Sequence, residues 1–245
     1  MEAIKTLMEF LDNSVTSYHA VDSMKKRLLD EGFVELSEKE AWHLEKGGNY
    51  FVIRNGSSLI AFKIPECEIS AVKGWHVYAA HSDSPAFKVK ETPEIPKEGV
   101  YVSINTEKYG SMMLSTWLDR PLTIAGRVCV ENKGEITTHL VRLKDNICMI
   151  PSLAIHMNRD VNNGVVLSTQ WDMLPLLSML CQEDRAKTSR GILNKMLAEM
   201  LSERTDRNYS AQDILSYDLY VENCEKAVLA GVENEFIMAP RYDDL

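Results

Sequence analysis

The stretch WHVYAAHSDSPAFKVK, residues 75–90, decides the predicted fold, because two kinds of structure meet within it. WHVYAA at 75–80 is apolar and partly aromatic, which is typical of a buried strand. HSDSP follows it directly, and from about Phe87 the chain changes to short alternating runs interrupted by prolines. Such runs are typical of a β-rich region. We therefore expect one domain to end near residue 90 and a different one to begin.

Upstream of this stretch the patterns predict two helices and a hairpin. Apolar residues recur at helical spacing over 2–12, and a second helical pattern starts near Tyr18. Gly32 is placed to end that second helix, since glycine accepts the left-handed conformation. Asn55-Gly56 separates two apolar runs, which is the strongest short hairpin signal in the chain.

Downstream the patterns predict more strands, with helices between them. TIAGRVCVENKGEITTHLVRL indicates a hairpin that turns at 132–134. Helices are expected near 171–181 and 189–203, and SAQD at 210–213 resembles a capping box that starts one more short helix. SYDLYVEN and NEFIMAP predict strands again. The order as a whole predicts an α/β domain interrupted by a second, β-rich domain with its own helices.

Composition excludes several classes of protein. The 245 residues are 45% hydrophobic and 26% charged, which is ordinary for a globular chain and excludes a disordered one. No apolar run approaches the roughly 20 residues that span a bilayer. The formal net charge of −9 argues against a general nucleic-acid binder, which needs basic clusters to displace counterions.

The cysteines and the first residues of the chain indicate the cellular compartment. Five scattered cysteines without a CxxC pair indicate reduced thiols and predict a cytoplasmic protein. The opening residues MEAIKTLMEFL lack a basic region followed by an apolar core, so we interpret them as a helix and not a signal peptide.

His81 and Asp83 form the first candidate site. Residues two apart in an extended segment point to the same face, and these two follow a predicted buried strand. Ligand sites in open α/β sheets gather at the carboxyl ends of strands. The histidine could bind a metal while the aspartate orients it. The alternative is a polar turn with Asp83 bonded to backbone amides, and spacing alone favours that alternative.

Asp243 and Asp244 form the second candidate site, because they follow the predicted strand NEFIMAP. Carboxylates at a strand end suit a divalent cation. The alternative is a frayed acidic terminus, which the local sequence favours.

Two further segments carry charged and aromatic side chains. IPSLAIHMNRDVNNG contains His156, and its mixed charges suggest a solvated or interface segment. The alternative is a loop with a satisfied histidine, which the local sequence favours. STWLDRPLTIAGRV contains Trp117, Asp119 and Arg120, for which core packing and a structural ion pair are expected. The chain has no GxSxG, GxGxxG, Walker A or HExxH pattern, so these give no nucleophile elbow, nucleotide loop or helix-borne zinc site.

Five segments together resemble the aspartyl aminopeptidases, metallopeptidases with two metal ions that remove acidic N-terminal residues. The resemblance covers nearly the whole chain in the correct order, which makes it specific. The segments are SYHAV (17–21), AAHSDSPAFKVK (79–90), YGSMMLSTWLDRPLTIAGRV (109–128), IPSLAIHMNRDVN (150–162) and EFIMAPRYDDL (235–245).

The resemblance implies roles for four residues. His81 would be a ligand of one metal, and Asp83 would be the carboxylate that orients it. Asp243 would bridge two divalent ions, most simply zinc, with cobalt or manganese as alternatives. His156 would reach the active site of a neighbouring subunit and help hold the substrate. Water held between two such ions loses a proton near neutral pH and can attack a peptide carbonyl.

The resemblance also implies a domain plan and an assembly. Residues 1–92 and 233–245 would belong to a zinc-aminopeptidase-like α/β catalytic domain, and 93–232 would be an inserted β-rich dimerisation domain. Dimers would assemble into a dodecamer that acts on peptides with an acidic N-terminus and involves neither nucleic acid nor membrane.

Two departures from the family qualify these expectations. The family's general-base glutamate and its further metal ligands lie beyond the bridging aspartate, so we expect this chain to be an incomplete N-terminal portion that is inactive alone. The family also usually has Asn where this chain has Asp244, which is a mild departure. Two alternatives therefore stay open: a non-catalytic assembly fragment, or a same-family enzyme that prefers neutral residues.

Overall fold

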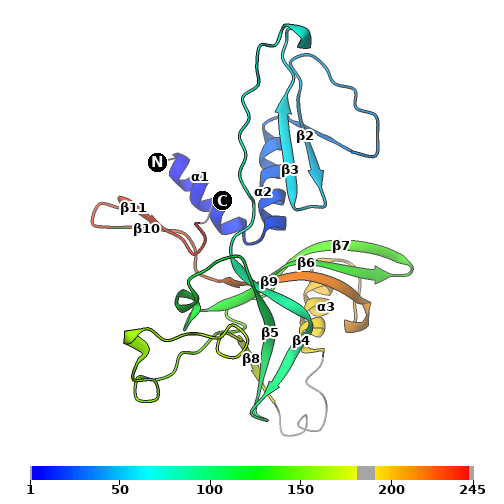
Figure 1. The fold of residues 1–245 in the computed structure, drawn as a ribbon. Coiled ribbons are helices and arrows are strands. Elements are labelled where there is room, and N and C mark those ends of the chain that lie inside the picture. Colours follow the sequence, from blue (N-terminus) through cyan, green and yellow to red (C-terminus); the bar gives the residue numbers. More distant parts are fainter. Residues whose placement is uncertain (1, 181–190, 243–245) are drawn as a thin grey trace. The chain divides into compact units, whose positions relative to one another are not determined.

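The computed structural model describes residues 2–180 and 191–242, and the chain divides into two compact units (Figure 1). The first unit contains residues up to Ser84 together with those from Lys226 onward, and the second is Pro85–Glu225. Helices and sheets are both present, so the predicted mixed α/β class is confirmed. Every helix in the described residues is too short or too polar to cross a bilayer.

Two helices open the first unit, as predicted. They are α1 (Glu2–Asn13) and α2 (Ser17–Asp30). The Thr16 side chain caps α2 by accepting a hydrogen bond from the His19 amide, which satisfies one of the amides left over at a helix start. Gly32, with φ of +78°, follows the end of α2, where the left-handed conformation terminates the helix.

Two small sheets complete the first unit. In one, β1 (Val34–Leu36) pairs parallel to β2 (Asn49–Arg54), which pairs antiparallel to β3 (Ser58–Lys63). The predicted Asn55-Gly56 turn joins β2 to β3, with φ of 54° and 68° at the two residues. In the other sheet, β10 (Val228–Ala230) pairs antiparallel to β11 (Phe236–Met238), which confirms the strand predicted in NEFIMAP.

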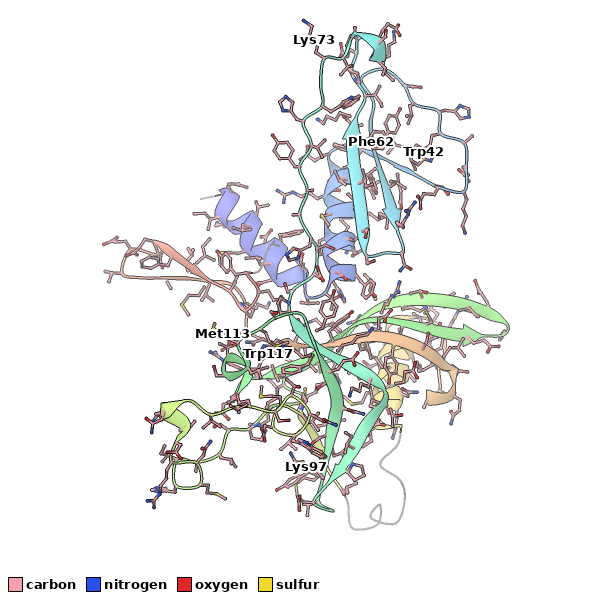
Figure 2. All side chains as sticks on the ribbon, in the orientation of Figure 1. Trp42, Phe62, Lys73, Lys97, Met113 and Trp117 are labelled. Atoms are coloured by element: carbon pink, nitrogen blue, oxygen red, sulfur yellow. The ribbon has the colours of Figure 1, made fainter. Side chains whose placement is uncertain are left out.

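Aromatic packing covers one side of the β2–β3 hairpin. The Trp42 ring stacks on the Phe62 ring with centroids 6.2 Å apart. Figure 2 labels both residues. Because a two-stranded hairpin is marginal alone, this contact and the packing of α2 against β3 stabilise it.

The strand predicted at 75–80 is wrong for this structure. Residues 72–85 have no regular secondary structure, and Val77 and Tyr78 are 82% and 92% exposed. Within the described parts of the chain, no strand pairs with this segment. A strand requires neighbours for its N–H and C=O groups, and an apolar sequence alone does not supply them.

The second unit is built on a six-stranded antiparallel sheet with the order β7-β6-β9-β4-β5-β8 (Figure 1). Its strands are β4 (Ala86–Lys97), β5 (Tyr101–Tyr109), β6 (Leu122–Asn132), β7 (Glu135–Arg142), β8 (Leu176–Met179) and β9 (Ile214–Asn223). The β6–β7 hairpin turns at Lys133 and Gly134, where it was predicted, and both residues have positive φ.

Helix α3 (Ile192–Arg204) covers one face of this sheet. Leu193, Leu197 and Leu201 lie at helical spacing and are buried in one cluster with residues of β6 and β9. The Glu94 carboxylate accepts hydrogen bonds from the Gly191 and Leu193 amides, so a residue of β4 caps the start of the helix. The helix predicted at 189–203 is confirmed from residue 192, and 181–190 lie outside the described residues.

The second unit also contains short 3-10 helices, and one helix predicted within it is a strand instead. The predicted capping box at Ser210 and Asp213 is present and starts the 3-10 helix η4 (Ala211–Asp213). The helix predicted near 171–181 is wrong, because Leu176–Met179 form β8 against β5. Pro175 precedes that strand, and a proline at this position disfavours a helix interior. The second unit also contains the 3-10 helices η2 (Leu114–Trp117) and η3 (Val161–Asn163), whereas η1 (Ile69–Ala71) belongs to the first unit.

Candidate metal centre

His81 and Asp83 contact each other, as their spacing predicted. His81 Nδ1 lies 3.1 Å from Asp83 Oδ1 and 2.9 Å from the Asp83 carbonyl oxygen. The two side chains are 45% and 38% exposed, so the pair is open to a ligand. Between them, the Ser82 hydroxyl donates a hydrogen bond of 3.0 Å to the Ser57 carbonyl oxygen, which ties the segment to the β2–β3 turn.

This geometry fits a histidine that binds zinc. Because Nδ1 faces two oxygen acceptors, the proton belongs on Nδ1, and Nε2 then carries the lone pair that a metal requires. A carboxylate on the second ring nitrogen fixes the tautomer and raises the basicity of the ligand nitrogen. Imidazole nitrogen is a preferred zinc ligand, so the chemistry of these two residues suits the ion.

The other predicted metal ligand cannot be compared with this pair. Asp243, together with Asp244, lies outside the described residues. In residues 2–180 and 191–242, no group of three or more histidine, cysteine, aspartate or glutamate side chains is close enough to hold a metal ion. The metal-bridging role of Asp243 therefore stays a prediction.

His156 lies in the second unit, within an exposed segment that contains several tight turns. The Met157 amide donates to the Ala154 carbonyl oxygen at 2.8 Å, which closes a turn around His156. Arg159 and Asp160 follow it and are also exposed. The substrate-holding role of His156 stays a prediction.

The segment with Trp117, Asp119 and Arg120 contains contacts that the sequence indicated only in part. Trp117 packs edge-to-face on Phe87 with ring centroids 5.1 Å apart, which agrees with the expected core role. Arg120 Nη1 contacts both carboxylate oxygens of Glu225 at 2.9 Å.

Asp119 is bonded to Ser152, and sequence reasoning missed this contact. The Ser152 amide and hydroxyl donate to the two carboxylate oxygens of Asp119. The two residues are 33 positions apart, and no local pattern connects them.

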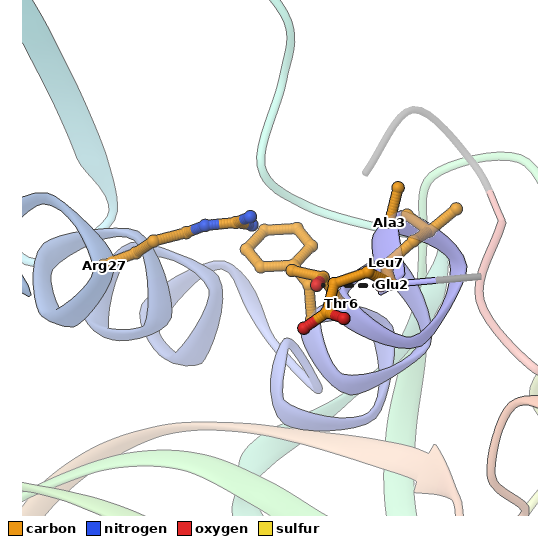
Figure 3. A pocket seen from close by; sticks show the side chains of 6 residues that line it. Glu2, Ala3, Thr6, Leu7 and Arg27 are labelled. Atoms are coloured by element: carbon orange, nitrogen blue, oxygen red, sulfur yellow. Dashed lines mark hydrogen bonds between the residues drawn. The ribbon is translucent and has the colours of Figure 1, made fainter. Parts of the chain in front are cut away.

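A hollow of about 500 Å³ lies between α1 and α2 (Figure 3). Arg27 reaches from α2 toward α1, and the Thr6 hydroxyl donates to the Glu2 carbonyl oxygen. Among the described residues, none of the predicted site residues lines this hollow, so it is separate from the His81–Asp83 pair. Its lining is Glu2, Ala3, Thr6, Leu7, Phe10 and Arg27.

Comparisons with known proteins agree on one family. The family model described as aminopeptidase I zinc metalloprotease (M18) matches residues 10–245. A probable M18 family aminopeptidase 2 of Clostridium acetobutylicum is 40% identical over 247 residues, which is 100% of this chain and 55% of that protein.

Solved structures support the same assignment. In a cryo-EM structure of the Ape4 and Nbr1 complex, the matching chain is 32% identical with a TM-score of 0.87, over 94% of this chain and 45% of that one. The S. cerevisiae mApe1 dodecamer is 25% identical with a TM-score of 0.72, over 97% of this chain and 51% of that one. The chain thus spans about half the length of the relatives it matches, and the expected fold is confirmed.

Proposed function

Because this chain belongs to the aminopeptidase I zinc metalloprotease (M18) family, we propose that the full-length protein is a metal-dependent aminopeptidase that releases N-terminal Asp and Glu from peptides. The observation that carries the proposal is the His81–Asp83 pair, whose geometry suits a metal-binding histidine held by a carboxylate. The acidic preference rests on the resemblance of five segments to the aspartyl aminopeptidases.

The proposed roles of the site residues follow from their chemistry. His81 would hold zinc through Nε2, while Asp83 keeps the proton on Nδ1 and fixes the plane of the ring. Asp243 would contribute a carboxylate ligand to the divalent ions. Bound zinc supplies Lewis-acid polarisation of a peptide carbonyl and makes water more acidic. His156 orients the substrate from a neighbouring subunit.

We also propose that the 245 residues alone do not turn over substrate. They span about half of the relatives they match, and a zinc site that catalyses hydrolysis needs three protein ligands in fixed geometry. The second unit, which we identify with the predicted dimerisation domain at 93–232, remains able to associate.

Self-association is supported by the surface of the second unit. Large apolar side chains are exposed along its segment 149–171, and such a patch is typical of an interaction surface. One structural relative is itself a dodecamer. The exposed residues are Met149, Leu153, Ile155, Met157, Val161, Val165, Val166 and Trp171.

Substrate hydrolysis tests the proposal. The full-length protein, stripped with a chelator and reloaded with zinc, cobalt or manganese, is assayed on aspartyl, glutamyl and leucyl chromogenic amides. We expect metal-dependent cleavage with kcat/KM higher for the two acidic substrates. Higher kcat/KM for the leucyl amide would replace the acidic preference with a neutral one, and metal-independent cleavage would contradict the mechanism.

A further inference from the structure

The short segment Trp117–Pro121 is fixed to the core of the second unit at several points. Trp117 packs on Phe87, and Leu118 forms a parallel β-bridge with Ile150. The Pro121 carbonyl oxygen accepts a hydrogen bond of 2.9 Å from the Cys224 amide. The 3-10 helix η2 ends at Trp117, the first residue of this segment, and Figure 2 labels Trp117 together with Met113, which precedes η2. The segment is therefore a rigid base from which a side chain can hold a neighbouring loop.

From this segment, Asp119 forms hydrogen bonds with Ile150 and Ser152, and we call this set of bonds the clamp. Its amide donates to the Ile150 carbonyl oxygen at 2.8 Å. The Ser152 amide donates to Asp119 Oδ1 at 2.9 Å, and the Ser152 hydroxyl donates to Oδ2 at 2.5 Å. The Ser152 hydroxyl, followed by the Ser152 amide, holds the pKa of Asp119 below its usual value. The carboxylate is thus charged at neutral pH, and charge-assisted bonds are the strong ones.

The backbone of Asp119 is in an uncommon conformation. Its φ is +57°, a left-handed value that residues other than glycine rarely adopt and that aspartate tolerates better than most. Such residues persist where the surrounding structure determines them, and they cluster at functional sites. Here the conformation lets one residue present its amide and both carboxylate oxygens to the same stretch of chain.

The stretch held by Asp119 leads directly into the segment that carries His156. Met149, at the start of that stretch, exchanges two backbone hydrogen bonds with Leu176, at 3.2 and 2.8 Å. Beyond Ser152, residues 153–166 are exposed except for Asn158. The direction in which this segment leaves the core is therefore set at Ile150–Ser152, where Asp119 holds it.

We propose that Asp119 is a positioning residue whose clamp on Ile150 and Ser152 orients the 153–166 segment so that His156 is presented for substrate binding. This inference rests on the proposed role of His156. Arg120 supports the clamp as well, because its contact with Glu225 ties the residue after Asp119 to the chain two residues beyond the end of β9.

The test is a double-mutant cycle in the active full-length protein. Asp119→Ala is expected to raise KM for an aspartyl substrate about tenfold to a hundredfold with a smaller effect on kcat, since misplacement of about 1 Å can have an effect of that size. In a His156→Ala background, the same change is expected to have no further effect. Asp119→Asn keeps an oxygen acceptor for the Ser152 amide, so it is expected to recover part of the loss.

The matched control is Asp213→Ala. Asp213 accepts hydrogen bonds from the amide and hydroxyl of Ser210, at 2.7 and 2.8 Å, but it caps η4 and is not bonded to the 150–152 stretch. It is expected to leave KM unchanged. The inference would be overturned if Asp119→Ala had the wild-type KM. It would also be overturned if the effects of Asp119→Ala and His156→Ala on KM were fully additive in the double variant.

Hydrogen exchange on the 245-residue chain separates this inference from the role of His156. Asp119→Ala is expected to speed exchange of the Met157 and Asn158 amides, which both donate to the Ala154 carbonyl oxygen, at least about tenfold, while Asp213→Ala does not. Unchanged exchange would overturn the positioning role. If exchange is faster but His156→Ala leaves KM unchanged, the positioning role of Asp119 would stand and the proposed role of His156 would be rejected.

Discussion

The carboxylate of Asp83 is the residue-scale feature on which the candidate metal centre depends. It contacts the ring nitrogen of His81 and so determines which nitrogen faces a metal. Replacing it with Asn removes the charge while keeping the size. We expect Asp83→Asn to weaken zinc binding by the full-length protein about tenfold to a hundredfold.

Zinc affinity measured by competition with a chromophoric chelator checks this prediction. Asp22→Asn is the control, because Asp22 pairs with Lys26 on the surface of α2 and is not one of the proposed site residues. Equal zinc affinities for the Asp83 and Asp22 variants would argue that Asp83 serves only to cap a turn.

Cys67 is exposed and Cys148 is buried, so we expect the two thiols to differ in reactivity. Burial, with a smaller contribution from Cys224, raises the pKa of the Cys148 thiol to about 12. Because the thiolate is the reactive form, we expect iodoacetamide at pH 8 to label the exposed Cys67 and to leave Cys148 unlabelled until the protein is denatured. Peptide mass spectrometry of the labelled protein identifies which cysteines have reacted. Labelling of Cys148 in the native protein would show that the core around it opens to solvent.

At the scale of elements, two glycines of the β6–β7 hairpin differ in their surroundings. A Cβ at Gly126 would lie 2.0 Å from the Asp218 carbonyl oxygen, whereas one at Gly134 would meet nothing within 4 Å. We expect Gly126→Ala to lower the free energy of unfolding by about 3 kcal/mol or more, because backbone must move. Gly134→Ala should lower it by about 1 kcal/mol, since only its positive φ is disfavoured.

Urea denaturation of both variants measures the difference. If Gly126→Ala were as stable as Gly134→Ala, the close approach of β6 to β9 would be incorrect.

The same elements explain which predictions from sequence succeeded. The turns at Asn55-Gly56 and at 132–134 depend on residues that accept positive φ, and that information is local. The helix predicted near 171–181 failed because pairing with β5 outweighed the apolar pattern. Spacing predicted that His81 and Asp83 share one face, and their side chains contact each other, but spacing alone favoured a polar turn over a metal site. The clamp between Asp119 and Ser152 joins distant segments, so only the folded chain reveals it.

At the scale of the whole molecule, the exposed apolar segment 149–171 predicts self-association. We expect the 245-residue chain to sediment as a dimer or larger at micromolar concentration. Val166, 94% exposed, should be buried on association, so Val166→Asp should weaken it at least about tenfold. Ile136→Asp on β7 is the control, because Ile136 is also exposed and lies outside the segment. A strictly monomeric wild-type chain would contradict this prediction.

The most direct test of the account is the zinc content and kcat/KM of two histidine variants of the full-length protein. His81→Ala removes the proposed ligand, while His76→Ala removes an exposed histidine of the same segment. We predict that His81→Ala loses bound zinc and lowers kcat/KM for an aspartyl substrate at least about a thousandfold, and that His76→Ala matches wild type. Full zinc content and wild-type kcat/KM in His81→Ala would contradict the assignment of this metal centre.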